Sequence, residues 1–270
     1  MTRSVLITGC STGIGHAAAE LFAKRGWKVF AGSRDPSRLK FNHSAIQPFL
    51  IDVNSAEDIN RAFTELPPLD CVINNAGYGL LLPFEDTPAE EIGKMFRTNV
   101  FGLMEVSRHA AKMMRGKGSG KIINISSVLG TIGIRWYAAY SATKWAVEGF
   151  SESLAHELKP FNIHVKIVEP GGTKTMFHDT AYDSVRPKIS EAYRESFGKK
   201  YASRGSPPVP NSVRAGKGDY DPPEKVAELI WQAANDDSWK LRHSAAQAKK
   251  TLFWQRVLGR DGLWKRLAIR

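Results

Sequence analysis

A glycine-rich turn close to the start of the chain constrains the fold more than any other feature. Residues 4–8 are a short β-branched and aliphatic run, and Gly9, Gly13 and Gly15 follow it, before an alanine-rich helical pattern that continues to Arg25. A strand, a glycine turn and a helix in this order aim backbone N–H groups and a helix N-terminus at a pyrophosphate. The turn predicts the first unit of a nucleotide-binding α/β sheet; a plain tight turn is the alternative.

Short apolar runs alternate with helical patterns along most of the 270 residues. The runs that we predict to be strands cover residues 4–8, 28–32, 48–53, 71–73, 121–125, 163–168 and 239–243. The helical patterns that follow the first one cover residues 56–66, 88–114, 136–159, 190–201 and 224–235. Strands that alternate with helices in this way predict an α/β fold with a doubly wound parallel sheet.

Composition and charge divide the chain into one large domain and a basic tail. An apolar content of 42% over this length suits a single large core, which we place in residues 1–245, with 173–223 as an inserted substrate loop. The net charge of +11 is concentrated, because residues 239–270 hold nine Lys/Arg and one acid. Since the basic residues belong to the tail and do not spread over the domain, we expect no nucleic-acid partner.

The sequence also carries predictions about the compartment. No run reaches about 18 uncharged apolar residues, and the first residues lead directly into a strand, so we expect neither a membrane span nor a signal peptide. Only two cysteines, Cys10 and Cys71, are present, which favours a reduced, cytoplasmic setting over a disulfide framework. The seven histidines are scattered, and we expect no metal site.

A serine, a tyrosine and a lysine form a candidate catalytic set. If residues 136–159 are helical, Tyr140 and Lys144 are i,i+4 neighbours on one face. A nearby cation favours the charged form of a phenol and lowers its pKa, which makes Tyr140 a plausible acid/base. Ser127, at the carboxyl end of the fifth strand, could donate a hydrogen bond to a carbonyl or alcohol oxygen. Taken alone, the tyrosine–lysine spacing is more typical of a surface pair on a helix. Whether it is catalytic depends on the motifs around it.

The end of the second strand bears on the cofactor. Ser33 is followed at once by Arg34, at a place where a NAD site usually offers an acid to the ribose and a 2′-phosphate needs a cation. This pattern favours NADP(H), and an arginine that only caps a turn is the alternative. Asn99 lies in an apolar stretch, where burial would oblige its amide to find partners. A buried asparagine whose amide is hydrogen-bonded within the core is an equally favoured interpretation of Asn99.

Together, these motifs resemble the short-chain dehydrogenase/reductase family over about residues 4–175. The motifs that carry the resemblance are Thr8-Gly9 with Gly13-Ile14-Gly15, Asp52-Val53, Asn74-Asn75-Ala76-Gly77, Asn99, Ser127, Tyr140 with Lys144, and Pro170-Gly171. The resemblance implies a seven-stranded Rossmann domain in which Ser127 polarises a carbonyl and Tyr140 donates or accepts the proton. It also implies that Lys144 holds the nicotinamide ribose and lowers the pKa of Tyr140. Asn99 would help to carry a water that relays protons to Lys144.

By the same resemblance, a larger set of residues binds the cofactor. Asp52 would lie near the adenine, Asn75 along the cofactor, and Thr173 or Thr175 beside the nicotinamide or a phosphate. The expected cofactor residues are Gly9, Ser11, Thr12, Gly13, Ile14, Gly15, Arg34, Asp52, Val53, Asn75, Ala76, Gly77, Tyr140, Lys144, Pro170, Gly171, Thr173 and Thr175. Apolar and aromatic residues near the site predict a hydrophobic substrate, and those expected to touch it are Tyr78, Leu129, Trp136, Met176 and Phe177.

The predicted function is an NADP(H)-dependent oxidoreductase that interconverts a ketone or aldehyde and an alcohol on a bulky or ring-bearing substrate. Within the family the chain is most similar to steroid-, retinol- and other lipophilic-alcohol dehydrogenases, on the strength of Arg34 and the extended C-terminal region. A cofactor-binding regulatory or scaffold protein on the same fold is an alternative. Such a protein would be expected to lack a member of the Ser-Tyr-Lys set, which is intact in this sequence. A peripheral membrane or nucleic-acid binder that acts through the tail is another, and it is compatible with an enzymatic function.

Two further surfaces predict assembly. The two long helical patterns, 88–114 and 136–159, resemble those that pair in family dimers, so we expect a homodimer or homotetramer. Residues 246–270 predict a basic, amphipathic C-terminal helical extension with apolar i,i+4 pairs such as Phe253 and Val257. We expect its apolar stripe to dock on its own domain or on a partner subunit, and binding to an anionic membrane is the less favoured alternative.

Overall fold

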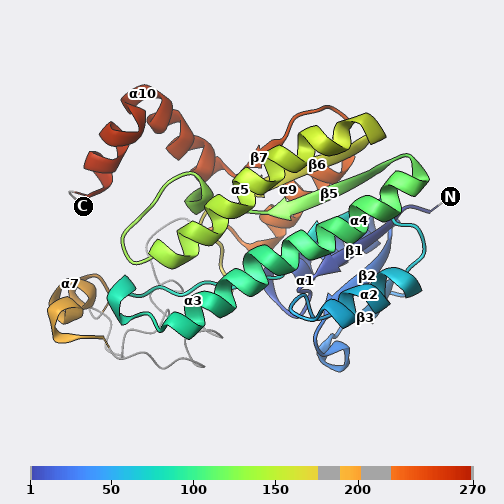
Figure 1. The fold of residues 1–270 in the computed structure, drawn as a ribbon, viewed down its shortest axis with the longest axis horizontal. Coiled ribbons are helices and arrows are strands. Elements are labelled where there is room, and N and C mark those ends of the chain that lie inside the picture. The colour runs from blue at the N-terminus through green and yellow to red at the C-terminus, as the bar shows by residue number, and fades with distance from the viewer. Residues whose placement is uncertain (1, 176–188, 202–219, 269–270) are drawn as a thin grey trace.

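The computed structural model describes residues 2–175, 189–201 and 220–268, and its centre is a seven-stranded parallel sheet (Figure 1). The strands are β1 (Ser4–Thr8), β2 (Lys28–Ser33), β3 (Ile46–Leu50), β4 (Cys71–Asn74), β5 (Gly120–Ile125), β6 (Ile163–Glu169) and β7 (Arg242–Ser244), in the order β3-β2-β1-β4-β5-β6-β7. Because β1 pairs with both β2 and β4, the strand order reverses beside β1, where doubly wound sheets bind ligands. The predicted Rossmann fold with a seven-stranded sheet is confirmed.

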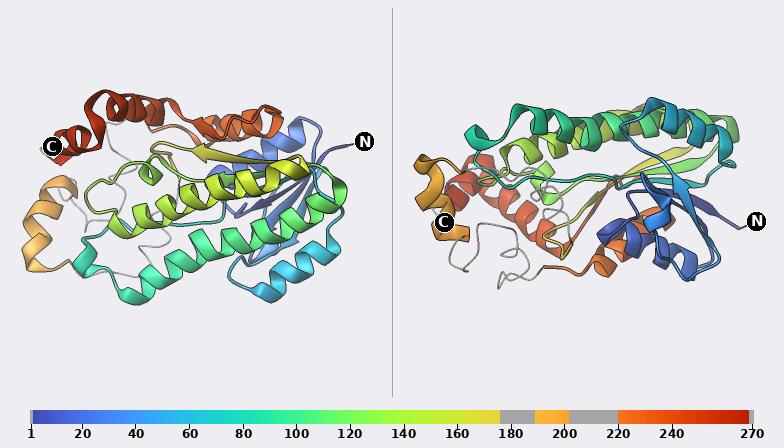
Figure 2. Two further views of the ribbon diagram at one scale, coloured as in Figure 1. Left: turned by 45° about the horizontal axis from the view of Figure 1, so that its top comes forward. Right: turned by 90° about the horizontal axis from the view of Figure 1, so that it is seen from below.

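Helices cover both faces of this sheet (Figure 2). They are α1 (Gly13–Lys24), α2 (Ala56–Glu65), α3 (Ala89–Phe96), α4 (Leu103–Lys117), α5 (Ala138–Leu158), α7 (Glu191–Tyr201), α9 (Pro223–Asn235) and α10 (Ala246–Ala268). Successive strand residues point to opposite faces, so Val5 and Ile7 pack with α1 and α9, whereas Leu6 packs with α2, α4 and α5. No helix in the described residues is long and apolar enough to cross a membrane.

Residues 88–114, predicted as one helix, form two helices joined by a wider turn. Arg97–Gly102 is π-helical, and α4 continues beyond it to Lys117. The wide turn is tied to the loop after β4, because the side chain of Asn99 hydrogen-bonds both backbone groups of Tyr78. The long helical segment is present, but its π-helical turn was not predicted, because such a contact is not visible in helical periodicity.

Both edge strands are shifted from their predicted positions. The strand predicted over 48–53 begins and ends earlier, as β3, because a turn follows in which the backbone N–H of Asn54 donates to the Asp52 carboxylate at 2.9 Å. The strand predicted over 239–243 is β7, which begins three residues later. The residues before β7 turn around the side chain of Lys166 instead.

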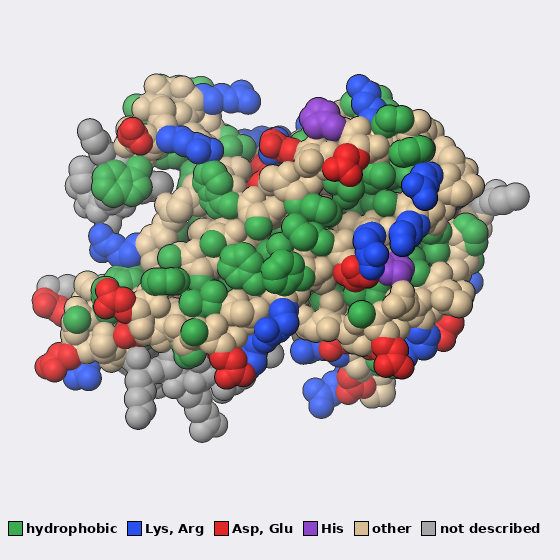
Figure 3. Space-filling model, viewed as in Figure 1, with side chains coloured by type: hydrophobic (Ala, Val, Ile, Leu, Met, Phe, Trp, Pro, Cys, Tyr) green, Lys and Arg blue, Asp and Glu red, His purple; other side chains and the backbone are tan. Residues whose placement is uncertain are grey.

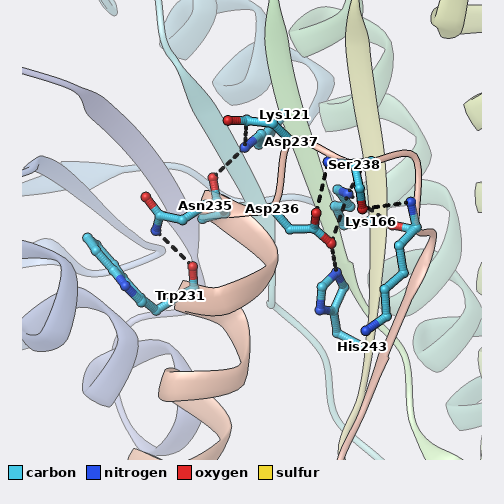
Figure 4. Close-up of polar contacts among 10 residues, drawn as sticks. Lys121, Lys166, Trp231, Asn235, Asp236, Asp237, Ser238 and His243 are labelled. Atoms are coloured by element: carbon cyan, nitrogen blue, oxygen red, sulfur yellow. Dashed lines mark hydrogen bonds and ion pairs between the residues drawn. The ribbon is translucent and has the colours of Figure 1, made fainter.

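Buried Lys166 holds this turn between α9 and β7 (Figure 4). Its Nζ donates to the carbonyl oxygens of Ser238 at 2.5 Å and Lys240 at 2.9 Å, and lies 3.5 Å from the carboxylate of Asp236. The Nε2 of His243, which is also buried, lies 3.2 Å from the same carboxylate. The position of β7 at the edge of the sheet therefore depends on contacts among titratable side chains.

This cluster predicts that acid destabilises the fold. Burial, with the positive charges of Lys240 and Lys166, lowers the pKa of His243 from 6.5 to about 4. Because the unfolded chain binds the proton more readily, the stability present above pH 6.5 is lost as the pH falls toward 4. Over this pH range, the free energy of unfolding of the variant His243→Gln should fall by roughly 2 kcal/mol less than that of the wild type.

Urea unfolding at pH 7 and pH 4.5 measures the effect. Although burial raises the pKa of Asp236, hydrogen bonds from Ser238 and the charge of Lys166 lower it to about 2, so this carboxyl contributes mainly below about pH 4. If His243→Gln loses as much stability as the wild type between the two pH values, the attribution to His243 is wrong.

Candidate active site

A cavity of about 1060 Å³ lies at the carboxyl ends of β1, β2, β4, β5 and β6. Its volume is at the upper end of the range of roughly 300–1,000 Å³ that is usual for ligand sites. The residues predicted for the cofactor that line it are Gly9, Ser11, Thr12, Gly13, Ile14, Arg34, Asp52, Val53, Asn75, Ala76, Gly77, Tyr140, Lys144, Pro170, Gly171, Thr173 and Thr175. Gly15 does not line it and has a packing role, because a Cβ there would lie 2.3 Å from the carbonyl oxygen of Gly9.

The glycine turn forms one wall of the cavity. Gly9 and Gly13 adopt left-handed backbone angles, with φ of 73° and 63°. A Cβ on Gly9 would lie 2.8 Å from the Cα of Ala76, so only glycine allows β1 and the loop after β4 to approach this closely. Thr12 precedes α1 in an extended conformation, and its side chain makes no capping hydrogen bond. The first N–H groups of α1 are thus available to an anion.

Thr8 and Asn75 bind the two central strand ends together. The hydroxyl of Thr8 accepts from the backbone N–H groups of Asn75 and Ala76, each at 3.0 Å. The amide of Asn75 donates to the carbonyl oxygens of Thr8 at 2.9 Å and Gly9 at 3.0 Å. Asn75 therefore shapes the floor of the cavity, in addition to lining it as predicted.

Cationic side chains stand at the β2 end of the cavity. Arg34 follows β2, is exposed, and forms no ion pair with the residues that the structure describes. Arg97 also lines the cavity, as do Lys94 and Glu91, which form an ion pair with each other at 2.7 Å. Sequence reasoning missed these three residues, because they lie on α3 and the π-helical turn and reach the site only through the tertiary fold. This end of the cavity suits a ligand with phosphate groups.

Ser127, Tyr140 and Lys144 meet at the opposite end. Tyr140 lies in the first turn of α5 and Lys144 one turn later, with only 7% and 5% of their surfaces exposed. Ser127 follows β5, and its hydroxyl is hydrogen-bonded to the phenol of Tyr140. The Nζ of Lys144 donates to the carbonyl oxygen of Ile125 at 2.8 Å. The structure brings the predicted catalytic hydroxyls to one point at the cavity wall.

Burial sets the protonation of this group. It raises the pKa of Tyr140 well above its ordinary value, and the hydrogen bond with Ser127 offsets only part of the effect. The pKa of Lys144 is lowered to about 8, mainly by burial, which the charge of Glu148 opposes. The prediction that Lys144 lowers the pKa of Tyr140 is wrong for this arrangement, since the ammonium lies 5.8 Å from the ring centroid and bonds elsewhere. Tyr140 is therefore protonated at neutral pH and can act as an acid.

Asn99 lies behind the cavity wall and does not line it. Its Oδ1 accepts from the backbone N–H of Tyr78 at 3.0 Å, and its Nδ2 donates to the Tyr78 carbonyl oxygen at 2.8 Å and to Thr143 at 3.2 Å. Its side chain thus ties the loop after β4 to α5, beside Tyr140. The hydrogen-bond partners that the buried amide of Asn99 requires are therefore protein groups.

The predicted substrate contacts are only partly brought together. Tyr78 and Leu129 line the cavity, whereas Trp136 does not. Trp136 adopts a φ of 74°, precedes α5, and packs edge-on against Tyr193 of α7 with ring centroids 5.6 Å apart. Its substrate contact stays a prediction. The packing with Tyr193 positions the segment before α5, which begins at Ala138 and not at Trp136 as predicted. Met176, Phe177 and most of the predicted loop 173–223 lie outside the described residues.

Three other residues on this side complete the apolar wall. Val128, Ile134 and Tyr137 line the cavity beside Leu129. Ile134 and Tyr137 flank Trp136 in the sequence, so this segment lies at the cavity although Trp136 itself does not line it.

A network of charges supports Lys144 from behind. Arg242 of β7 places its Nε 3.0 Å from the carboxylate of Glu148 and 3.4 Å from that of Glu169. Glu169 is fully buried at the end of β6, directly before Pro170 in the cavity wall. One arginine therefore joins α5, β6 and β7 one helical turn from Lys144.

A glycine-cradled cavity with a Ser-Tyr-Lys set at its wall agrees with the similarities of the chain. Residues 3–185 match the family model "short chain dehydrogenase". The chain belongs to the short-chain dehydrogenase/reductase family and is an oxidoreductase.

Individual relatives extend this result. The chain is 38% identical over 197 residues, 72% of each chain, to "3-ketodihydrosphingosine reductase" of Bacteroides thetaiotaomicron. It is 32% identical over 280 residues to "Uncharacterized oxidoreductase YusZ" of Bacillus subtilis. That match covers 97% of this chain and 96% of the other.

Solved structures show the same fold. A short-chain dehydrogenase from Streptomyces avermitilis has a TM-score of 0.79 and 28% identity over 99% of this chain and 97% of that chain. "ElxO with NADP Bound" has a TM-score of 0.69 and 27% identity over 90% and 98%. The subgroup within the family stays a prediction.

Proposed function

We propose that the protein is an NADP(H)-dependent oxidoreductase that interconverts a ketone or aldehyde and an alcohol on a hydrophobic substrate. The observation that carries the proposal is the position of Ser127 and Tyr140, hydrogen-bonded to each other at one end of a cavity whose other end presents Arg34. Apolar side chains, among them Val128, Leu129 and Tyr137, line the cavity beside these hydroxyls. The relatives whose solved structures contain NADP support the choice of cofactor.

The residues at the β2 end and the glycine turn fit this cofactor. The free N–H groups at the start of α1 and the backbone at Gly9 and Gly13 would hold the pyrophosphate. Arg34 would hold the 2′-phosphate of the ribose, because a guanidinium forms several charge-assisted hydrogen bonds with a phosphate. Asp52 lines the cavity near this end, where the adenine would lie.

The residues at the opposite end handle the proton. When bound, NADPH supplies a hydride to the carbonyl carbon. The adjacent hydroxyls of Ser127 and Tyr140 would both bond the carbonyl oxygen, and Tyr140, protonated at neutral pH, would donate its proton to it. Lys144 would bond the nicotinamide ribose with the N–H groups that Ile125 leaves available. Asn99 would support a water that returns a proton to Lys144.

The apolar wall is the basis for the substrate class. Leu129 and Tyr140 belong to a buried cluster that Tyr78, Val128 and Tyr137 extend. Such a wall stabilises substrates through the apolar surface that they bury, at roughly 25 cal/mol per Å². Rates of NADPH oxidation with aldehydes and ketones of increasing apolar size test this proposal. We expect kcat/KM to rise with size, and a preference for small polar carbonyls would contradict it.

The charge of Glu148 is expected to set the upper pH limit of activity. Glu148 raises the pKa of Lys144 against the effect of burial. Replacement by Gln should therefore lower that pKa below about 8 and move the alkaline limb of kcat/KM for reduction to lower pH. The control is Glu152→Gln, because Glu152 is exposed and also bonds Arg242. An unchanged profile in Glu148→Gln would show that Glu148 does not tune Lys144.

We also propose that the chain forms a homodimer or homotetramer through α4, α5 and the turn before α4. Hydrophobic side chains gather over these elements on one face (Figure 3), and Phe101 and Trp145 are 60% and 37% exposed there. Exposed apolar surface of this kind is typical of an interface.

Light scattering at micromolar concentration tests the assembly. We expect a mass of at least twice the 29.9 kDa of the chain. Phe101→Asp should lower the mass, because the interface would have to bury a charge. Phe84→Asp, at an exposed residue outside α4 and α5, should not. A single-chain mass for the wild type would refute the proposal.

A further inference from the structure

One side of α10 docks on the domain. Ala248 is fully buried, and Leu263 is 5% exposed. The side-chain amide of Gln255 donates to the carbonyl oxygen of Thr131 at 3.5 Å, and the guanidinium of Arg260 lies 4.8 Å from the ring centroid of Trp145. The helix bends at Gly259 and lies at the end of the molecule away from the N-terminus (Figures 1 and 2). This side of the helix therefore docks on the domain, whereas Phe253 and Val257, which were expected to dock, are exposed.

The outward side of α10 combines exposed apolar residues with cations. Phe253 and Val257 are 58% and 57% exposed, one helical turn apart. Lys249, Lys250 and Arg256 lie at positions three or four residues from one or other of them, so all five side chains share one face of the helix. Beyond the bend, Trp264 is 64% exposed. The contacts of α10 with the described domain therefore do not account for these exposed apolar side chains.

We propose that this outward face of α10 binds the surface of an anionic lipid bilayer. Apolar side chains flanked by Lys and Arg are typical of helices that lie in the interfacial plane, where the apolar groups enter the lipid and the long cationic side chains reach the head groups. The charge is complementary, because the sequence of α10 holds six Lys/Arg and one Asp. A bilayer with negative head groups compensates these charges and buries the apolar residues in one contact.

A second copy of the chain is a poorer occupant. A two-fold contact between two α10 helices would bring the same cations against each other, and like charges oppose such an interface. A nucleic acid would compensate the charge, but phosphate contacts leave the apolar side chains exposed. Both are outcomes that an experiment can separate from lipid binding.

The position of α10 connects this surface with the cavity. Gln255 bonds Thr131, which directly follows the short 3₁₀ turn Val128–Gly130, and Val128 and Leu129 line the cavity. A bilayer on the outward face would therefore lie beside the apolar wall. Lipid binding itself stands on α10 alone, whereas delivery of a hydrophobic substrate from the bilayer rests on the proposed function.

Sedimentation of the full chain with vesicles tests the surface. Phosphatidylcholine vesicles with and without 30% phosphatidylglycerol are the probes, as a choice of roughly physiological negative charge. We expect binding to the anionic vesicles only, weakened by salt. Lys249→Gln with Lys250→Gln and Arg256→Gln should reduce the partition coefficient by about a hundredfold. Phe253→Ser with Val257→Ser should reduce it by at least about tenfold.

The matched control is Phe161→Ser, because Phe161 is 40% exposed at the far end of α5 and should bind vesicles like the wild type. Circular dichroism shows whether each variant keeps its helices. Equal binding to neutral vesicles, wild-type binding by both multiple variants, or binding to RNA without binding to vesicles would each overturn the proposal. NADPH oxidation with a water-soluble aldehyde, measured without vesicles, reports on the proposed function separately.

Discussion

Replacing Tyr140 by Phe is expected to lower kcat for carbonyl reduction by roughly a hundredfold to ten-thousandfold, the usual contribution of a positioned general acid. The phenol is buried beside Ser127, and its raised pKa keeps it protonated at neutral pH, so its hydroxyl is available for the proposed role of proton donor. Phe retains the ring and its packing with Leu129, so the fold and the affinity for NADPH should change little. Steady-state kinetics and fluorescence titration with NADPH measure the two effects.

Tyr193→Phe provides the control for removal of a phenol. Tyr193 lies on α7, outside the cavity lining, and its hydroxyl donates to Glu85 at 2.8 Å. This variant should keep a turnover near that of the wild type. A Tyr140→Phe enzyme with near-native kcat would remove Tyr140 from its assigned role.

Arg34→Ala is expected to weaken NADPH binding by about ten- to a hundredfold and NADH binding much less. Arg34 lines the cavity after β2 and forms no ion pair with any described residue, so its guanidinium is available to a 2′-phosphate. Hydrogen bonds to charged groups contribute about 1.5–3 kcal/mol each, which sets the expected range. Dissociation constants for both cofactors, from titration of the same preparations, give the comparison.

Arg38→Ala is the matched control for a lost cation. Arg38 follows four residues later, lies outside the cavity lining, and pairs with Asp35 at 3.0 Å. We expect it to leave the preference for NADPH unchanged. Equal losses for NADPH and NADH in Arg34→Ala, or a native preference for NADH, would contradict the assignment of the 2′-phosphate site.

The parts of the fold that were predicted correctly depend on local patterns. Gly9 and Gly13 stand where a strand must turn into a helix, and both adopt the left-handed angles that such a turn requires. The spacing of Tyr140 and Lys144 depends only on helical geometry, and both lie on α5 as expected. Ser127 meets them because parallel strands bring their carboxyl ends to one edge of the sheet.

The parts that were not predicted depend on contacts between distant segments. The π-helical turn at Asn99 is joined to the backbone of Tyr78, and Lys94 and Arg97 reach the cavity from α3 and the same turn. The protonation of Tyr140 follows from its burial, which is a property of the packed domain. The helical periodicity of residues 88–114 does not show the π-helical turn, and the i,i+4 spacing of Tyr140 and Lys144 does not show how deeply the phenol is buried.

Transfer of deuterium from NADPH labelled at C4 of the nicotinamide tests the central proposal most directly. The wild-type enzyme, NADPH with deuterium at the transferred position and a bulky hydrophobic ketone are incubated, and the alcohol is analysed by mass spectrometry. We predict one deuterium on the carbinol carbon for each NADPH oxidised, at a rate that falls strongly in Tyr140→Phe. NADPH oxidation that leaves no deuterium in an alcohol product, or no oxidation with any carbonyl substrate, would contradict the proposed function.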